Sequence, residues 1–394
     1  MRVFMRKRKI LFPITSKIHY ARQKLLLDLL RDHPRFELQL VLAGSVLVEK
    51  YAEQFSPAIT RAGFAIKDTL YNVIDGGNHV SMAKSAGLTA LELSNTIQRL
   101  NPDMVLVRAD RFEQLAIAMV AAYLNKTIVH LEGGDVSGTI DESVRHAITK
   151  LAHVHFVTNE AARKRVIQMG ENPEMVFDVG SPDVEFAASV RKKLDEGFMR
   201  RIGTGKDIDF RKPFVVVIQH PVTTEPDNRK HIEALLEAVD GLGVQAVWFW
   251  PNIDAGTNEM AKAIRGWREL GKLKNNRIKF VTDLLPEDFI ALLRRASCVI
   301  GNSSAGIKEC SFLGIPSVTI GTRQADRLRG PNVLEVPHEK KEIAGAVKAQ
   351  LGHGPYPRSD IYYKPKTSKR IVEILEKIPL VVQKRFYERV EAVI

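Results

Sequence analysis

Short runs of apolar residues alternate along this chain with longer segments in which apolar residues recur with helical spacing. The runs predict strands that are buried on both faces of a sheet, and the longer segments predict amphipathic helices that cover it. In the first half the predicted strands are 9–15, 36–42, 104–107, 127–131, 155–157 and 175–179. The predicted helices there are 21–32, 81–100, 112–124, 141–152 and 160–169. This alternation is typical of a doubly wound parallel sheet.

The alternation is lost in residues 181–212, which are rich in charge, and then begins again. The second set of predicted strands is 214–218, 246–249, 278–281, 298–300, 317–320 and 333–336, and the helices are 231–242, 259–270, 287–295, 341–350 and 368–377. Two such halves predict an α/β fold of two Rossmann-like, doubly wound domains facing across a cleft, the architecture called GT-B. We expect a first domain at 1–180, a linker at 181–212, a second domain at 213–365, and C-terminal helices in 366–394 that pack back on the first domain.

The amino-acid composition of the chain indicates which kinds of binding partner to expect. The formal net charge is +12, but Lys and Arg are scattered over amphipathic segments without a basic stripe that contains aromatic residues. We therefore expect no nucleic acid partner, and an anionic small substrate accounts for the charge equally well. No apolar run approaches about 20 residues, so no membrane span is expected. The two cysteines, Cys298 and Cys310, are too few for a disulfide framework and favour a cytoplasmic protein.

The stretch 301–323 contains a candidate binding site. A predicted strand is followed by a turn with Ser303 and Ser304 and by a predicted helix. Unpaired N–H groups and the positive end of such a helix attract an anion, for which a phosphate is the natural candidate. Glu309 on that helix suits the hydroxyls of a ribose, and Arg323 after the next strand suits phosphate oxygens. The alternative interpretation is an ordinary serine cap at a strand–helix turn.

Further polar clusters follow predicted strands in both halves. They contain Asp110, Glu132, the pair Asp141 and Arg145 at a helix start, and His220. Each acidic residue, taken alone, is also explained as a favourable charge at the beginning of a helix. Because the carboxyl ends of parallel strands meet at one edge of a sheet, we expect these side chains to lie together.

The motifs of common cofactor sites are missing from the sequence. His153 and His155 have no carboxylate or cysteine at ligand spacing, so we expect no metal ion. No G-x-G-x-x-G follows a predicted strand, and neither a serine nucleophile elbow nor a P-loop lysine motif is present. We therefore expect no cofactor.

Several longer motifs resemble one enzyme family. GNSSAGIKE followed by IGTRQ, HLEGGDVSGTIDESVRHAITKLAHVHFV, HPVTTE and PNIDAG occur in the order found in the hydrolysing UDP-N-acetylglucosamine 2-epimerases of bacterial sialic-acid pathways. Matched to that family, the catalytic residues fall on Asp110, Glu132, Asp141, Arg145 and His220. The residues that the resemblance assigns to substrate or UDP binding are Lys17, Asn252, Ser303, Ser304, Gly306, Glu309 and Arg323.

The chain departs from the family pattern in two places. The usual R-A-D-Y or R-A-D-W element reads Lys17-Ile18-His19-Tyr20, which keeps the cation but loses the acid. The usual H-G-D-R reads Arg108-Ala109-Asp110-Arg111, which adds a cation and a methyl group beside a proposed catalytic acid.

The resemblance implies a reaction that needs neither a metal nor a nicotinamide. UDP leaves C1 of the sugar as a proton leaves C2, and water and a proton then add to give N-acetylmannosamine for sialic-acid-type sugars. A homodimer or homotetramer that binds UDP-N-acetylglucosamine or a close relative is expected. The alternatives are the same reaction on a 2,4-diacetamido-trideoxy sugar, a non-hydrolysing UDP-sugar 2-epimerase, a GT-B glycosyltransferase and a catalytically silent UDP-sugar sensor.

Overall fold

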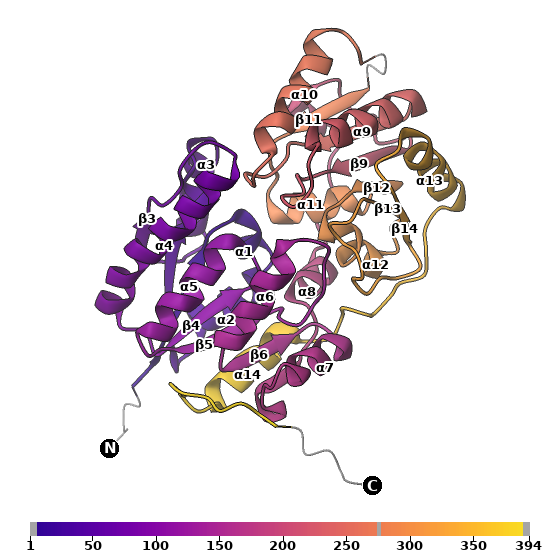
Figure 1. The fold of residues 1–394 in the computed structure, drawn as a ribbon. Helices are drawn as coiled ribbons and strands as arrows, with labels where there is room; N and C mark the ends of the chain where they lie inside the picture. Colours follow the sequence, from indigo (N-terminus) through magenta and orange to yellow (C-terminus); the bar gives the residue numbers. More distant parts are fainter. Residues whose placement is uncertain (1–5, 274–276, 389–394) are drawn as a thin grey trace.

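The computed structural model describes residues 6–273 and 277–388, which form two lobes beside each other (Figure 1). Within these residues the strands form two seven-stranded sheets, one in each lobe. The strand order is β3-β2-β1-β4-β5-β6-β7 in the first sheet and β14-β13-β12-β9-β10-β11-β8 in the second. The predicted fold of two doubly wound α/β domains is confirmed.

The first sheet is parallel throughout, and β4 and β5 are buried along their whole length because helices cover both faces. Its strands are β1 (Arg8–Ile14), β2 (Phe36–Ala43), β3 (Ile66–Leu70), β4 (Met104–Arg108), β5 (Thr127–Leu131), β6 (Val154–Val157) and β7 (Val176–Asp178). The helices of this part of the chain are α1 (Lys17–Ala21), α2 (Lys24–Asp32), η1 (Gly44–Leu47), α3 (Glu49–Arg61), α4 (His79–Leu100), α5 (Phe112–Tyr123), α6 (Ile140–Leu151), α7 (Glu160–Gln168), η2 (Pro173–Met175) and α8 (Pro182–Ser189), where η marks a 3₁₀-helix.

The second sheet is parallel except for its edge strand β8, which pairs antiparallel with β11. Its strands are β8 (Thr204–Gly205), β9 (Phe214–Ile218), β10 (Gln245–Phe249), β11 (Ile278–Val281), β12 (Cys298–Gly301), β13 (Ser317–Ile320) and β14 (Val333–Val336). The helices are η3 (Phe198–Arg201), α9 (Asn228–Leu242), α10 (Thr257–Glu269), α11 (Pro286–Leu293), η4 (Ser304–Gly306), α12 (Glu309–Leu313) and α13 (Lys340–His353).

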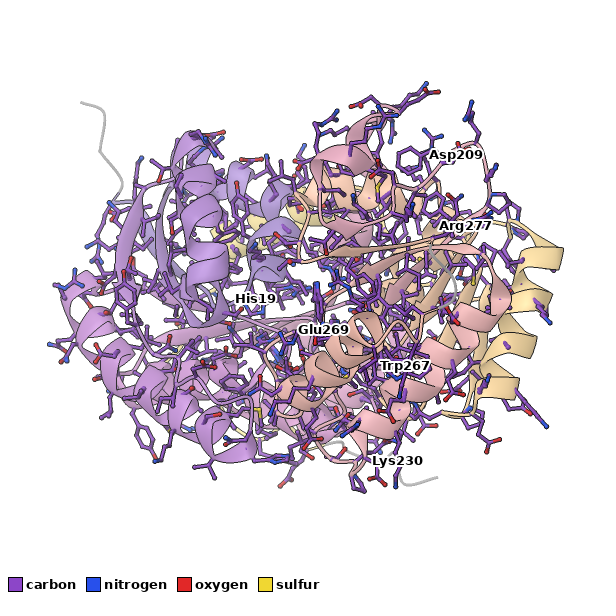
Figure 2. The ribbon with its side chains drawn as sticks, turned by 90° about the horizontal axis from the view of Figure 1, so that it is seen from above. His19, Asp209, Lys230, Trp267, Glu269 and Arg277 are labelled. Carbon is purple, nitrogen blue, oxygen red and sulfur yellow. The ribbon has the colours of Figure 1, made fainter. Side chains whose placement is uncertain are left out.

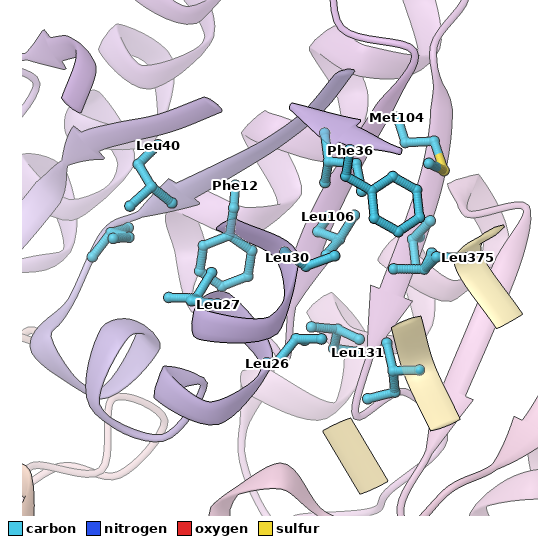
Figure 3. Packing of buried hydrophobic residues seen from close by; sticks show 14 of the residues in the cluster. Phe12, Leu26, Leu27, Leu30, Phe36, Leu40, Met104, Leu106, Leu131 and Leu375 are labelled. Atoms are coloured by element: carbon cyan, nitrogen blue, oxygen red, sulfur yellow. The ribbon is translucent and has the colours of Figure 1, made fainter. Parts of the chain in front are cut away.

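The last described helix, α14 (Thr367–Lys377), returns to the first lobe (Figure 1). Its side chains Ile371, Val372 and Leu375 belong to the same buried core as Phe12 of β1. Figure 3 shows Leu375 close to Phe36 at one end of this core. Strand β1 near the start of the described chain and helix α14 near its end therefore share one hydrophobic core.

Outside the cavity, the structure differs from the predicted elements in three places. Residues 43–80, for which the pattern predicted no element, contain α3 and the edge strand β3, whose sequence IKDTL is too polar to stand out as a buried strand. The predicted helix 21–32 begins only at Lys24, as α2, and the residues before it form a separate short helix, α1. The segment 181–212, predicted to be a linker without the strand–helix alternation, contains α8, η3 and β8.

The loops that follow β1, β4, β5, β9, β10, β12 and β13 all contribute residues to one cavity between the lobes. This agrees with the rule that parallel α/β sheets bind ligands beyond the carboxyl ends of their strands. Among the described residues, none of the helices has the length and apolar character needed to cross a membrane.

Candidate active site between the two lobes

The cavity between the lobes has a volume of about 350 Å³. Figure 2 shows one of its lining residues, His19, at the boundary between the two lobes. Every residue that the sequence assigned to a site lines this cavity, with the exception of Gly306: Lys17, Asp110, Glu132, Asp141, Arg145, His220, Asn252, Ser303, Ser304, Glu309 and Arg323. Gly306 is buried instead, and a Cβ atom there would overlap the hydroxyl of Ser317 on β13.

Asp110 and Arg145 are the central pair among the residues with which the first lobe lines the cavity. Asp110 lies just beyond β4, and Arg145 on α6 donates from Nε to its Oδ2 atom at 2.8 Å. The Arg145 side chain is only 2% exposed, and its Nη1 also donates to the backbone oxygen of Asp135 at 2.6 Å. Asp141 begins the same helix, where the side chain of Thr139 accepts its backbone N–H. One helix thus carries both Asp141 and the cation that holds Asp110.

Glu132 is held on both of its oxygens. Oε1 accepts from Lys308 Nζ at 3.1 Å and from Ser181 Oγ at 3.0 Å. Oε2 accepts from Arg108 Nη2 at 2.6 Å. Glu132 has a positive φ of 66°, so the chain turns sharply after β5 and directs this carboxylate to its partners.

These contacts continue between the lobes as a chain of charges, of which all but the half-buried Arg22 are buried. Arg108 also donates to Asp183 Oδ1 at 2.8 Å, and Asp183 pairs in turn with Arg22 at 3.1 Å. Arg22 reaches Glu309 Oε1 of the second lobe at 2.8 Å. The nucleotide-site candidate Glu309 is therefore connected to the catalytic candidate Glu132 through three further side chains.

The second lobe contributes loops that Asn302 ties together. Its side chain exchanges two 2.8 Å hydrogen bonds with the backbone of His220, and its backbone oxygen accepts from Arg323 Nη1 at 3.3 Å. The helix predicted after the turn with Ser303 and Ser304 is interrupted, because the 3₁₀ turn η4 precedes the short helix α12. Ser303 accepts the N–H of Ala305, so its hydroxyl does cap the first turn.

Comparison with known proteins identifies the family of this chain. A family model described as UDP-N-acetylglucosamine 2-epimerase matches residues 28–376. This chain belongs to the UDP-N-acetylglucosamine 2-epimerase family. A Neisseria meningitidis protein named UDP-N-acetylglucosamine 2-epimerase is 31% identical over 97% of this chain and 99% of its own length.

Two further comparisons describe the breadth of this epimerase family. A Legionella pneumophila protein named UDP-N,N'-diacetylbacillosamine 2-epimerase (hydrolyzing) is 31% identical over 95% of this chain and 97% of its own length. The crystal structure of UDP-GlcNAc 2-epimerase from Neisseria meningitidis bound to UDP-GlcNAc matches with a TM-score of 0.76 at 15% identity, over 94% of this chain and 100% of that chain. The structural match supports the fold, and the sequence match supports the family.

The carboxylates of this epimerase-family protein differ in their affinity for protons. Burial and the negative charge of Asp110 raise the pKa of Asp141 to about 6. Although burial opposes it, the positive charges of Arg145 and Arg327 lower the pKa of Asp110 to about 2. Against the same effect of burial, Arg108 and Lys308 hold the pKa of Glu132 well below its usual range. Near neutral pH, Asp141 is therefore the member of this set that readily gains and loses a proton.

His220 is neutral in this epimerase-family site, because burial and the charge of Arg323 lower its pKa to about 3. Its Nδ1 accepts the backbone N–H of Asn252 at 3.3 Å. The proton of the neutral ring is consequently on Nε2, and His220 can donate a hydrogen bond from that atom.

The cavity also contains residues to which sequence reasoning assigned no role. Arg22, Arg111, Asp183, Lys308 and Arg327 all line it. In the sequence, Arg111 directly follows Asp110, and Lys308 directly precedes Glu309. Their positions within the motifs could therefore have identified them as site residues. Arg22 and Asp183 lie in segments without a polar motif, and their role depends on partners that are distant in the sequence.

Proposed function

We propose that this epimerase-family protein is a hydrolysing UDP-N-acetylglucosamine 2-epimerase that releases N-acetylmannosamine and UDP for sialic-acid-type sugar synthesis. One observation supports this above all: acids of the first lobe and the cation-bearing loops of the second lobe line a single cavity. A nucleotide sugar in this cavity would have its sugar near Asp110, Glu132 and Asp141. Its diphosphate would lie near His220 and Arg323. In this proposal residues 1–180 supply the catalytic carboxylates and residues 213–365 bind UDP.

The first half-reaction is an elimination. The bond between C1 and the diphosphate oxygen breaks with its electron pair going to UDP, a proton leaves C2, and a C1–C2 double bond forms. The C2 proton becomes acidic only as positive charge develops at C1, so the site must stabilise opposite charges at once. Asp110 stays ionised and faces the positive charge. Arg323 and the Nε2–H of His220 face the departing diphosphate.

We assign the removal of the C2 proton in this elimination to Asp141. It is the carboxylate whose pKa lies near neutral pH, and a third of its side chain is exposed to the cavity. In the second half-reaction water adds its oxygen to C1, and a proton is returned to the opposite face of C2. Glu132 is held by three donors, so its role is to orient Lys308 and Arg108 around the sugar.

The remaining residues are assigned to UDP. Glu309 Oε2 is buried and has no hydrogen-bond partner among the described residues, which leaves it available to a ribose hydroxyl. Ser303, Ser304 and Asn252 supply hydrogen bonds to the nucleotide, and Lys17 adds a positive charge beside Asp283. Gly306 acts indirectly, because its lack of a side chain allows the serine turn to pack against β13.

The likeness to the Legionella pneumophila protein supports a second candidate, the same reaction on a UDP-linked 2,4-diacetamido sugar. The two candidates differ only in the group at C4 and in the C6 hydroxyl of the sugar. Parallel assays with both nucleotide sugars separate them by their kcat/KM values.

The reaction class is tested in heavy water with UDP-N-acetylglucosamine and detection by proton NMR. The proposal expects free N-acetylmannosamine carrying deuterium at C2, together with UDP. A UDP-linked epimer as the final product would identify a non-hydrolysing epimerase. Sugar transfer to an acceptor without deuterium at C2 would indicate a glycosyltransferase and would contradict the proposal.

A further inference from the structure

Three side chains of the second lobe bring metal-binding atoms together outside the cavity described above. Glu225 lies in the loop after β9, His231 in the first turn of α9, and His338 just after β14. His231 Nδ1 lies 3.7 Å and His338 Nε2 lies 3.8 Å from the same oxygen, Oε2 of Glu225. All three atoms are within 4.8 Å of one another. None of the three residues lines the substrate cavity.

Three of the four ring nitrogens of this cluster are buried without hydrogen-bond partners. Among the described residues, His231 Nδ1 and both nitrogens of His338 have none. Leaving buried polar atoms without partners is unfavourable and calls for an explanation. Glu225 Oε1 accepts a hydrogen bond from Thr322 Oγ1, so Oε2 remains directed at both rings. The side chains are 12–23% exposed, which leaves a path from solvent.

We propose that Glu225, His231 and His338 bind a divalent transition metal ion with the chemistry of Zn²⁺. Two imidazole nitrogens and one carboxylate oxygen are the ligands that Zn²⁺ accepts, whereas Mg²⁺ and Ca²⁺ prefer oxygen. Water supplies the fourth ligand. With ligand bonds of about 2.0–2.1 Å, neighbouring atoms of a tetrahedral site are about 3.3 Å apart. Both nitrogen–oxygen separations therefore need to shorten by about 0.5 Å.

Binding also requires a change in ring orientation. The two imidazoles are stacked with their centroids 3.8 Å apart and their planes 7° from parallel. An ion bound by both rings lies in both ring planes, so the rings must turn about their Cβ–Cγ bonds. This rotation is local, since His231 begins a helix and His338 lies in the loop before α13.

The position of the site suggests what the ion does. Glu225 belongs to the same loop as His220, and its partner Thr322 precedes Arg323. An ion held by Glu225 would fix these two loops to α9 and to the segment after β14. The site would thus stabilise the residues that face the diphosphate, without contacting the substrate.

The test uses untagged protein that has been treated with a chelator and is then titrated with Co²⁺. We expect one equivalent to bind with a Kd below about 10 µM and to give the intense visible absorption of four-coordinate Co²⁺, which Zn²⁺ then removes. The variant His231→Phe keeps a flat ring for stacking but lacks Nδ1, and Glu225→Gln keeps the size of the side chain. Each should weaken binding at least tenfold.

His353→Phe is the matched control. His353 is stacked on Tyr356 with the same 3.8 Å centroid separation, but its Nδ1 is paired with the oxygen of Gly354. Its replacement should leave Co²⁺ binding unchanged. Absence of binding by the wild-type protein at 100 µM Co²⁺ would overturn the proposal. Equal binding by the wild type, His231→Phe and Glu225→Gln would do the same, because the ion would then occupy another site.

Discussion

Asp110 and Asp141 are chemically the same side chain, but their neighbours give them different roles. Asp110 accepts from Arg145 at 2.8 Å, whereas Asp141 lies 3.7 Å from Arg323 and is repelled by the charge of Asp110. The closer cation keeps Asp110 ionised. Asp141 consequently titrates in the range where a catalytic acid or base is useful.

The pH dependence of activity tests the role of Asp141. Since the pKa of Asp141 is raised to about 6, its basic form is lost as the pH falls through that value. We expect kcat/KM to decrease below pH 6 in the way that follows from the protonation of a single group. Asp141→Asn should lower turnover by ~10²-fold or more and should abolish this pH dependence. A wild-type profile that is flat between pH 5 and pH 8 would contradict the assignment.

The ionised form of Asp141, which activity requires, should lower the stability of the folded protein. A carboxyl whose pKa is raised on folding is ionised at a cost to the folded state above pH 6, and this cost disappears below its ordinary pKa. Asp141→Asn should therefore raise the thermal unfolding midpoint by about 2 °C at pH 8 and leave it unchanged at pH 4. Differential scanning calorimetry at the two pH values measures the difference.

His220 is expected to act as a neutral hydrogen-bond donor. Its replacement by Ala should reduce turnover by ~10²-fold, because the donor facing the diphosphate is lost. His220→Gln keeps an N–H group of similar reach and should recover at least tenfold of that loss. Equal activities of the two variants in steady-state assays would show that proton transfer from the ring is required instead.

The chain of charges between the lobes is made of side chains from helices and strands that are far apart in the sequence. Glu132 follows β5, Arg108 ends β4, Asp183 begins α8, Arg22 follows α1 and Glu309 begins α12. Asp183 is fully buried between the two arginines. Removing a buried partner leaves a charge without compensation, which is costly.

Asp183→Asn tests this charge chain. We expect the variant to lose about 3 kcal/mol of stability, because Arg22 and Arg108 lose a shared anion. The exposed pair of Asp195 and Arg201 offers a matched control, and Asp195→Asn should leave the unfolding midpoint unchanged. Denaturant unfolding followed by fluorescence compares the variants. Similar midpoints for Asp183→Asn and the wild type would show that the chain does not stabilise the interface.

The two lobes meet closely at a glycine. Gly138, before α6, lies so near the backbone of Thr322 that a Cβ atom would overlap the carbonyl oxygen. The ion pair of Asp141 with Arg323 and the 3.3 Å hydrogen bond from Arg327 to Val136 lie along the same boundary. The absence of a side chain at residue 138 thus allows the acids to approach the cations.

Gly138→Ala should separate the lobes at this boundary. We expect KM for the nucleotide sugar to rise about tenfold and kcat to fall, because the two halves of the site no longer meet closely. Gly87→Ala on α4 is the control, since a Cβ atom there meets open space. That change should leave the kinetics unaltered and add about 0.5–1 kcal/mol of stability. Wild-type kinetics in Gly138→Ala would argue against close contact during catalysis.

Much of the fold followed from local patterns. Buried strands such as β4 and β5 are continuous apolar runs, so they were predicted within a residue or two. The edge strand β3 was missed because its solvent-facing side chains are polar. The cavity residues were found because their motifs follow predicted strands. Gly306 belongs to the same motif but packs inward, which no spacing argument could distinguish.

Hydrophobic periodicity and the residues after each strand were sufficient to infer two doubly wound domains and to bring Asp110, Glu132 and His220 to one cavity, because both are properties of neighbouring residues. Which charged side chains pair with each other could not be inferred from neighbouring residues. Arg22 with Asp183, Lys308 with Glu132, and the cluster of Glu225, His231 and His338 join segments that are distant along the chain. Protonation and metal binding depend on distance and burial in three dimensions, and these arise only when the lobes fold and meet.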